Sequence, residues 1–144
     1  MNATLSAALI VKNEEAILQK CLDSIKSFVD EIIIVDTGST DKTKEIASKF
    51  TDKIYDFKWV DDFSAARNFS FSKCTKEFIL WIDADDVVKP IDVEKIQRLD
   101  YSDKQIILCR YQYTHDEYGN VILSLMRERI VKRSLNLKWE QPIH

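Results

Sequence analysis

The stretch Phe78-Ile79-Leu80-Trp81-Ile82-Asp83-Ala84-Asp85-Asp86 joins five consecutive apolar residues directly to three carboxylates. An apolar run of this length predicts a strand that is buried on both of its faces. Because an unpaired carboxylate is costly to bury, the three aspartates must mark the place where the strand leaves the core. Ligands bind at the carboxyl ends of parallel strands, so this turn predicts a site for a divalent cation and the phosphate behind it.

Strands and helices alternate on the N-terminal side of this stretch. The predicted strands are 5–11, 32–35, 53–57 and 78–82. The predicted helices are about 14–28, a second that Ser39 or Thr40 would cap, a third that opens at 61–64, and a short fourth with Pro90 in its first turn. This alternation predicts a parallel sheet with right-handed crossovers.

The pattern changes in the last third of the chain. Residues 105–114 and 121–131 are two strand-like runs, and the polar segment 116–120 between them predicts a hairpin loop. The expected fold class is therefore α/β, with a mostly parallel sheet that a C-terminal antiparallel hairpin makes mixed. A length of 144 residues fits one domain with a sizeable core.

Composition excludes several classes of protein. With a net charge of −3 and no block of basic residues, the chain shows no sign of binding nucleic acid. It contains two glycines, too few for a dinucleotide-binding GxGxxG fingerprint or a Walker A loop. The three cysteines lack metal-type spacing and are expected to be reduced, as in a cytoplasmic protein. The apolar run 5–11 is too short to span a membrane.

Three predicted strands end in polar or acidic loops, at 12–15, 36–41 and 83–86. Polar residues are common at strand ends, so any one of these loops could be an ordinary turn. Parallel strands bring all three loops to one edge of the sheet, however, and together they favour a binding site. Alternate residues past a strand can point to the same side, so Asp83 and Asp85 leave room for a cation and a diphosphate.

Other polar and aromatic residues leave alternatives open. Arg67, in the third predicted helix, is either a solvated arginine or a guanidinium aimed at a phosphate or a base. A solvated face is expected for Arg127, Arg129, Lys132 and Arg133. The three tryptophans are expected to be core or edge aromatics. Two histidines are too few for a Ser/His/Asp arrangement or a zinc site of several His and Cys ligands.

Five segments of the chain resemble motifs of the family 2 glycosyltransferases with a GT-A fold. They are Val11-Lys12-Asn13-Glu14-Glu15, Val35-Asp36-Thr37-Gly38-Ser39-Thr40-Asp41, Phe63-Ser64-Ala65-Ala66-Arg67-Asn68, Trp81-Ile82-Asp83-Ala84-Asp85-Asp86 and Trp139-Glu140-Gln141-Pro142-Ile143-His144. The resemblance covers nearly the whole chain and implies a Rossmann-like α/β/α sandwich. It implies that residues 1–144 form a single, C-terminally truncated donor-binding domain.

The resemblance also implies a function and a set of site residues. The donor would be a nucleotide-diphospho-sugar, usually a UDP-sugar, held with Mg²⁺ or Mn²⁺ and transferred with inversion. The nucleotide-sugar would contact Val11, Asn13, Glu14, Asp36, Gly38, Arg67, Asp83 and Ala84. The metal would be bound by Asp85, Asp83 and His144, with Asp86 in a supporting or capping role.

Complete GT-A domains of this kind are longer, and their usual base and most of the acceptor site would lie beyond His144. The acceptor would be a glycan, a lipid or a protein, as in cell-surface polysaccharide synthesis. The protein would be cytoplasmic, at most peripheral at the inner membrane. The alternatives are a non-catalytic or truncated nucleotide-sugar-binding module, a sugar nucleotidyltransferase, which would need an early glycine-rich loop, and a receiver-type domain.

Overall fold

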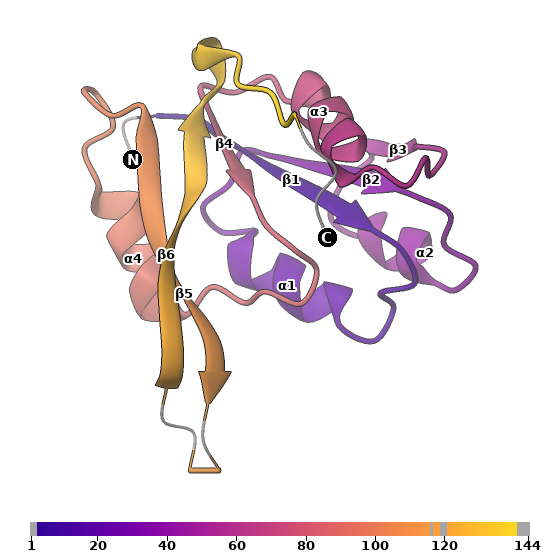
Figure 1. Cartoon of the computed structure of the whole chain (residues 1–144), viewed down its shortest axis with the longest axis horizontal. Helices are drawn as coiled ribbons and strands as arrows, with labels where there is room; N and C mark the ends of the chain where they lie inside the picture. The colour runs from indigo at the N-terminus through magenta and orange to yellow at the C-terminus, as the bar shows by residue number, and fades with distance from the viewer. Residues whose placement is uncertain (1–2, 116, 119–120, 141–144) are drawn as a thin grey trace.

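The computed structural model in Figure 1 describes residues 3–115, 117–118 and 121–140. Six strands form one sheet in the order β3-β2-β1-β4-β6-β5. The elements in chain order are β1 (Leu5–Val11), α1 (Leu18–Ile25), β2 (Glu31–Asp36), α2 (Thr43–Ala47), β3 (Ile54–Asp56), α3 (Phe63–Lys73), β4 (Phe78–Trp81), α4 (Pro90–Arg98), β5 (Ile106–His115), β6 (Val121–Lys132) and the 3-10 turn η1 (Arg133–Leu135).

The predicted α/β class with a mixed sheet is confirmed. β1 pairs in parallel with β2 and with β4, and β2 pairs in parallel with β3. The C-terminal hairpin enters through β6, which runs antiparallel to β4 and to β5. Every residue of β4 is buried, as expected for an apolar strand with neighbours on both sides.

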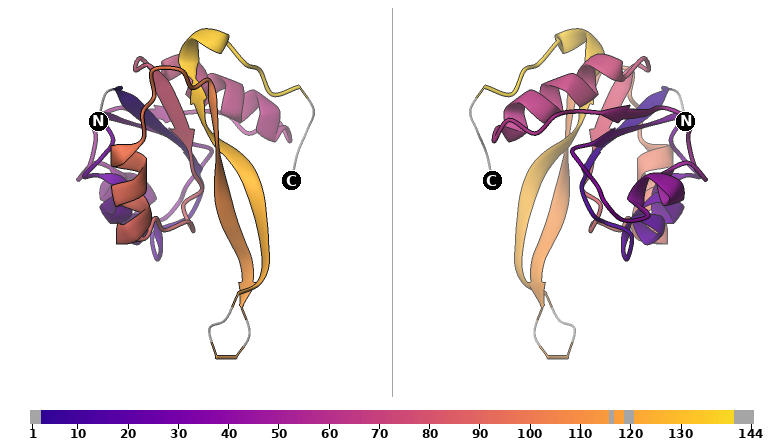
Figure 2. Two further views of the ribbon diagram at one scale, coloured as in Figure 1. Left: turned by 90° about the vertical axis from the view of Figure 1, so that its left-hand side faces the viewer. Right: turned by 90° about the vertical axis from the view of Figure 1, so that its right-hand side faces the viewer.

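Helices cover both faces of the sheet (Figure 2). One apolar cluster joins α1, α2 and α4 to one face, through residues such as Leu22, Ala47 and Ile96. The other cluster joins α3 to the opposite face around Ile33, Ile79 and Val131. The side chains of a strand alternate between its two faces, so neighbouring residues of β4 contribute to different clusters. The result is the expected α/β/α sandwich.

The β5–β6 hairpin is longer than the other strands, and its far part extends away from the body of the sheet (Figure 1). Only the end of β6 next to η1 pairs with β4, through Leu80 opposite Ile130 and Phe78 opposite Lys132. This pairing brings residues near position 130 beside the end of β4.

Two local predictions are wrong in detail. The helix predicted over about 14–28 is limited to α1, with turns on either side of it. The second helix begins after Lys42, which forms no side-chain cap, so neither Ser39 nor Thr40 caps it. Those two residues instead hydrogen-bond to Asn13 of the preceding loop. Two other predictions are confirmed, since α3 begins within 61–64, after its capping residue Asp62, and Pro90 opens α4.

The cysteines agree with the expectation of reduced thiols. Cys21, Cys74 and Cys109 are all free thiols. Among the residues that the structure describes, no helix has the length and apolar character needed to cross a bilayer.

Candidate functional site

The loops that follow β1 and β2 are cross-linked at the carboxyl edge of the sheet. Asn13, which adopts a left-handed backbone with φ of 53°, donates its N–H to Ser39 Oγ over 2.9 Å. Its side-chain Oδ1 accepts the N–H of Thr40 over 2.8 Å. Glu14 N–H in turn donates to Thr43 Oγ1 over 2.8 Å. The two loops therefore form one rigid rim rather than two independent turns.

Asp36, the last residue of β2, is the most buried carboxylate of this rim, with 2% of its surface exposed. Its Oδ1 accepts the N–H groups of Gly38 and Ser39, each over 2.8 Å. Its Oδ2 is buried and has no hydrogen-bond partner among the described residues. Gly38 has φ of +122°, a conformation that favours glycine. A buried acceptor without a partner is costly, so Asp36 is ready to accept an N–H or O–H group from a ligand.

The turn that follows β4 is closed by its own hydrogen bonds. Asp86 N–H donates to the carbonyl of Asp83 over 2.9 Å, and Asp83 N–H donates to Asp86 Oδ2 over 3.0 Å. Ala84 is buried at 4% exposure, whereas Asp85 is exposed. Carboxylate oxygens of Asp83, Asp85 and Asp86 lie within 4.8 Å of one another.

Two arginines pair with two of these three aspartates. Arg67 Nη2 of α3 lies 3.2 Å from Asp83 Oδ1. Arg129 Nη1 of β6 lies 3.1 Å from Asp86 Oδ2, in a pair whose side chains are 9% and 11% exposed. Asp85 forms no ion pair within the described part of the chain. Among the residues that the structure describes, Asp85 is therefore the one carboxylate of this turn without an ion-pair partner.

Negatively charged side chains crowd together at this edge of the sheet. Desolvation, and then the charges of Asp86 and Asp83, raise the pKa of Asp85. Glu14 lies near the same group, and desolvation followed by the charges of Asp85, Asp41 and Asp83 raises its pKa. Crowded oxygen ligands of this kind suit a hard divalent cation such as Mg²⁺ or Mn²⁺, which would relieve the repulsion. The donor set at the end of β4 thus fits the expected metal.

The structure brings most of the predicted site residues to this edge. Glu14 lies near Asp83 and Asp85, and Arg67 contacts Asp83 directly. Val11 and Asn13 link the loops after β1 and β2. The Val11 carbonyl accepts the Thr37 N–H, and Asn13 Oδ1 accepts the Thr40 N–H. His144, predicted as a metal ligand, lies outside the described residues.

Arg129 is a residue that the sequence prediction placed wrongly. It was expected on a solvated face, yet it is 8% exposed and lies against the acidic turn. Strand alternation was the available signal, since Arg129 shares a face with the buried Val131 two positions later. Trp139 was also missed as a neighbour of this edge, since its ring lies 5.2 Å from that of Trp81 and 5.3 Å from the Arg67 guanidinium.

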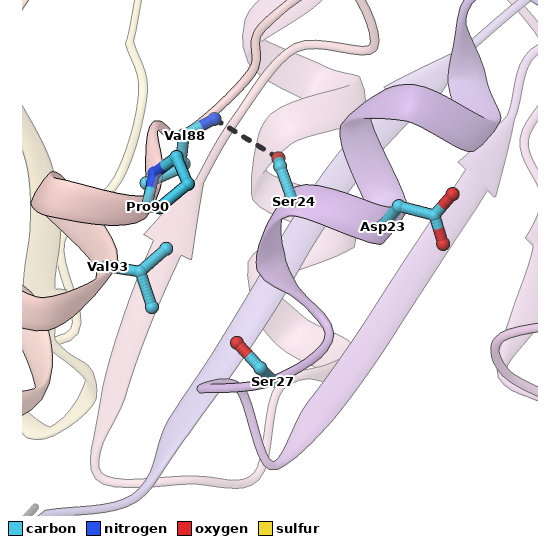
Figure 3. A pocket seen from close by; sticks show the side chains of 6 residues that line it. All are labelled: Asp23, Ser24, Ser27, Val88, Pro90 and Val93. Atoms are coloured by element: carbon cyan, nitrogen blue, oxygen red, sulfur yellow. Dashed lines mark hydrogen bonds between the residues drawn. The ribbon is translucent and has the colours of Figure 1, made fainter.

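Two hollows of the molecule lie apart from the carboxylates of this site. One hollow of about 240 Å³ lies between α1 and the start of α4, where Ser24 Oγ accepts the Val88 N–H (Figure 3). A second hollow of about 240 Å³ lies beside the end of α3 and η1. Neither is lined by Asp36 or by the aspartates of the turn after β4. Geometry and charge, rather than hollow size, therefore identify the candidate site.

Comparison with known proteins gives a consistent result. Residues 6–144 match the family described as glycosyl transferase family 2. The chain is 34% identical over 143 residues, 99% of its length, to a TPR repeat-containing protein of Synechococcus elongatus. It is 40% identical over 98 residues, 67% of its length, to the prophage-derived glycosyltransferase SunS of Bacillus subtilis. These matches span 35% and 23% of the two relatives' own lengths.

A solved structure is similar in both fold and sequence. Glucosyl-3-phosphoglycerate synthase of Mycobacterium tuberculosis, solved with Mn²⁺ and UDP-glucose, superposes with a TM-score of 0.52. The match covers 60% of this chain and 34% of that one, at 27% identity.

Proposed function

The chain belongs to glycosyl transferase family 2, and from that premise we propose that it is the donor-binding part of an inverting glycosyltransferase. The donor is a nucleotide-diphospho-sugar, a UDP-sugar, bound together with Mg²⁺ or Mn²⁺. The observation that carries this proposal is the meeting of two features at one sheet edge. One is the buried Asp36 oxygen without a partner, and the other is the carboxylate cluster after β4.

Each part of the rim has a role in this proposal. Asp36 accepts a hydrogen bond from the base or ribose, beside the Asn13–Glu14 loop and the open backbone at Gly38. Arg67 brings its positive charge toward the base or the phosphates. Asp83 and Ala84 border the ribose, with Asp83 also within reach of the metal, and Asp85 is the main metal ligand. The M. tuberculosis enzyme, solved with Mn²⁺ and UDP-glucose, supports both the donor class and the ion class.

The chemistry requires stabilisation of a leaving diphosphate. A divalent cation bound beside Asp85 would act as a Lewis acid toward the negative charge that develops on that group. Arg67 would add charge-assisted hydrogen bonds from the protein itself. A base must also deprotonate the acceptor hydroxyl. We assign that base to none of the described residues.

Isothermal titration with UDP tests the proposal directly. In the presence of excess Mn²⁺ the folded chain should bind UDP, and addition of a chelator should weaken that binding because it removes the cation that would offset the charge of the diphosphate. Absence of UDP binding in excess Mn²⁺, with the circular dichroism spectrum of a folded α/β protein, would contradict the proposed function.

A non-catalytic nucleotide-sugar-binding module is the second candidate. It is favoured by one observation, that the carboxylate cluster and the Arg67–Asp83 pair of the site account for binding of a donor and its cation alone. Sugar transfer to glycan, lipid or protein acceptors, measured for this chain and for a longer chain, would separate the two candidates. The proposed cytoplasmic location is supported by the three free thiols, which suit a reducing compartment.

A further inference from the structure

Arg129 occupies an unusual position for a charged residue. It lies in β6 immediately before Ile130, which pairs with Leu80 of β4, so the sheet places it beside Trp81. Its guanidinium carbon lies 4.1 Å from the centroid of the Trp81 ring. Charged side chains are seldom buried to this extent unless they are paired, so a specific reason must keep Arg129 there.

The contacts of Arg129 span the acidic turn from one end to the other. At the start of the turn, Nη1 donates to the Trp81 carbonyl over 3.3 Å. At its end, the same nitrogen lies 3.1 Å from Asp86 Oδ2. That carboxylate oxygen also accepts the Asp83 N–H, which closes the turn. Arg129 therefore holds the Asp86 carboxylate in the position in which it accepts the Asp83 N–H and closes the turn.

Arg67 contacts the same ring and the other paired aspartate. Its guanidinium carbon lies 4.5 Å from the Trp81 ring centroid, and it pairs with Asp83. The two arginines differ in their surroundings, because the Asp83 side chain is 43% exposed whereas that of Asp86 is 11% exposed. The Arg67–Asp83 pair is thus accessible to a ligand through Asp83, whereas both side chains of the Arg129–Asp86 pair are nearly buried.

We propose that Arg129 is a positioning residue of the donor site. It fixes Asp86 as a structural brace of the turn, so that the turn offers Asp83 and Asp85, and not Asp86, to the cation. The inference rests on the proposed function for the identity of the ligand. It goes further in giving the three aspartates different roles, since Asp83 and Asp85 face the cation and Asp86 supports the turn. An arginine is needed because one planar guanidinium can stack on Trp81 while bonding the carbonyl and the carboxylate.

The first experiment needs no metal. Backbone amide hydrogen exchange, followed by NMR, is compared between the wild-type chain and Arg129→Met, Arg129→Lys and the exposed control Arg98→Met. In Arg129→Met the Asp83 and Asp86 amides should exchange at least about tenfold faster, because loss of their hydrogen-bonded geometry exposes them. Amides of β1 and β2 should be unchanged. Equal protection of Asp83 and Asp86 in both arginine variants and the wild type would overturn the inference.

The second experiment measures Mn²⁺ affinity in the presence of UDP, by electron paramagnetic resonance. Arg129→Met should weaken Mn²⁺ binding by about 10- to 100-fold, the usual effect of removing a group that orients a metal ligand. Arg129→Lys should recover only part of the loss, and Arg98→Met should match the wild type. If Arg129→Met does not fold, Arg129→Lys carries both measurements.

A double-mutant cycle separates a brace from a ligand. If Asp86 acts through Arg129, the losses of Mn²⁺ affinity in Asp86→Asn and Arg129→Lys should not add in the double variant. Additive losses would show that Asp86 contributes independently, as a direct ligand would, and would overturn the inference. Failure of the wild-type chain to bind Mn²⁺ with UDP would instead reject the proposed function, while the amide exchange would still decide whether Arg129 positions the turn.

Discussion

Unequal pairing distinguishes the three aspartates of the turn after β4. Asp83 is paired with Arg67 at a half-exposed position, and Asp86 with Arg129 at a buried one. Asp85 is exposed and, within the described residues, forms no ion pair. A bound cation gains most from the carboxylate whose charge is not already neutralised, so Asp85 is the strongest candidate for a metal ligand.

Asp85→Asn should therefore remove most of the metal-dependent affinity for UDP. The substitution keeps the size of the side chain but replaces a charged oxygen ligand with a neutral one, and Mn²⁺ favours charged oxygen. We expect UDP binding with Mn²⁺ to weaken by about tenfold or more, and UDP binding with chelator to stay nearly constant. Titration calorimetry gives both values, with the exposed Asp103→Asn as control. Unchanged binding in Mn²⁺ would show that Asp85 has no metal role.

Glu31 is a buried carboxylate at the start of β2, the opposite edge of the sheet from the site. It accepts hydrogen bonds from Ser6 Oγ and Thr75 Oγ1, each over 2.7 Å, and pairs with Lys53 over 2.5 Å. Burial alone would raise the pKa of Glu31, but the bonds from Lys53, Ser6 and Thr75 outweigh it and lower the pKa to about 2. These bonds connect β2 to β1, to the segment before β4 and to the loop before β3.

Glu31→Gln should lower the free energy of unfolding at pH 7 by about 2 kcal/mol, since charged hydrogen bonds are lost while Lys53 can still be hydrated. The folded pKa of Glu31 lies below its unfolded value of 4.5, so its contribution is present above pH 4.5 and is lost as the pH falls toward 2. The difference in the free energy of unfolding between wild type and Glu31→Gln, measured by urea unfolding, should therefore become smaller as the pH falls through that range. A gap independent of pH, or an equal effect of the exposed Glu45→Gln, would contradict this role.

Among the elements, α3 is the one that ties the C-terminal segment to the site. Asn68 Nδ2 donates to the Trp139 carbonyl over 2.8 Å, and Asn68 Oδ1 accepts the Trp139 N–H over 2.7 Å. This pair of bonds imitates the pairing of two strands and fixes the Trp139 backbone against the helix. The Trp139 ring then packs edge-on against Phe71 and Trp81.

Asn68→Ala should release this segment without unfolding the sheet. Loss of two hydrogen bonds, each worth about 1 kcal/mol, should speed tryptic cleavage after Lys138 by about tenfold or more. Asn68→Asp, which keeps only the acceptor for the Trp139 N–H, should give an intermediate rate, and the exposed Gln97→Ala should leave cleavage unchanged. Mass spectrometry of the released peptide measures the rate. Equal cleavage rates for Asn68→Ala and wild type would mean that the two hydrogen bonds of Asn68 do not hold the backbone at Trp139.

For the whole molecule, the sheet separates two apolar clusters that share the same strands. Cys21 belongs to the cluster beneath α1, and Cys74 to the cluster beneath α3. Burial is the main cause that raises the pKa of each thiol to about 12. Cys109, on the edge strand β5, is only partly buried.

Thiol labelling should show that the two clusters open together. Because neither buried thiol can react until its cluster opens, Cys21 and Cys74 should be labelled at one common rate that tracks global unfolding in urea. Cys109 should be labelled faster. Site-resolved mass spectrometry after alkylation at pH 8 measures all three. Faster labelling of Cys74 than of Cys21 in the native state would show that the α3 face opens separately.

Much of the fold could be predicted because its signals are local. The apolar run of β4, the start of α3 at 61–64 and the proline of α4 each depend on residues within a few positions, and all three predictions are confirmed. The cap of α2 could not be predicted, because Ser39 and Thr40 are used by Asn13, which is 26 and 27 positions away. A capping residue that has a distant partner is no longer available to the helix.

By itself, the sequence determined that an apolar strand delivers three carboxylates to the edge of a parallel sheet, and its ordered motifs indicated the family. Local periodicity reports whether a strand is buried, and that information suffices for this much. Only the tertiary structure decided which aspartates are paired. The partner of Asp86 lies 43 positions away in β6. It reaches the turn because β6 runs antiparallel to β4, a pairing that no local spacing encodes. Because of that non-local pairing, Arg129, which was expected in solvent, is buried and paired with Asp86.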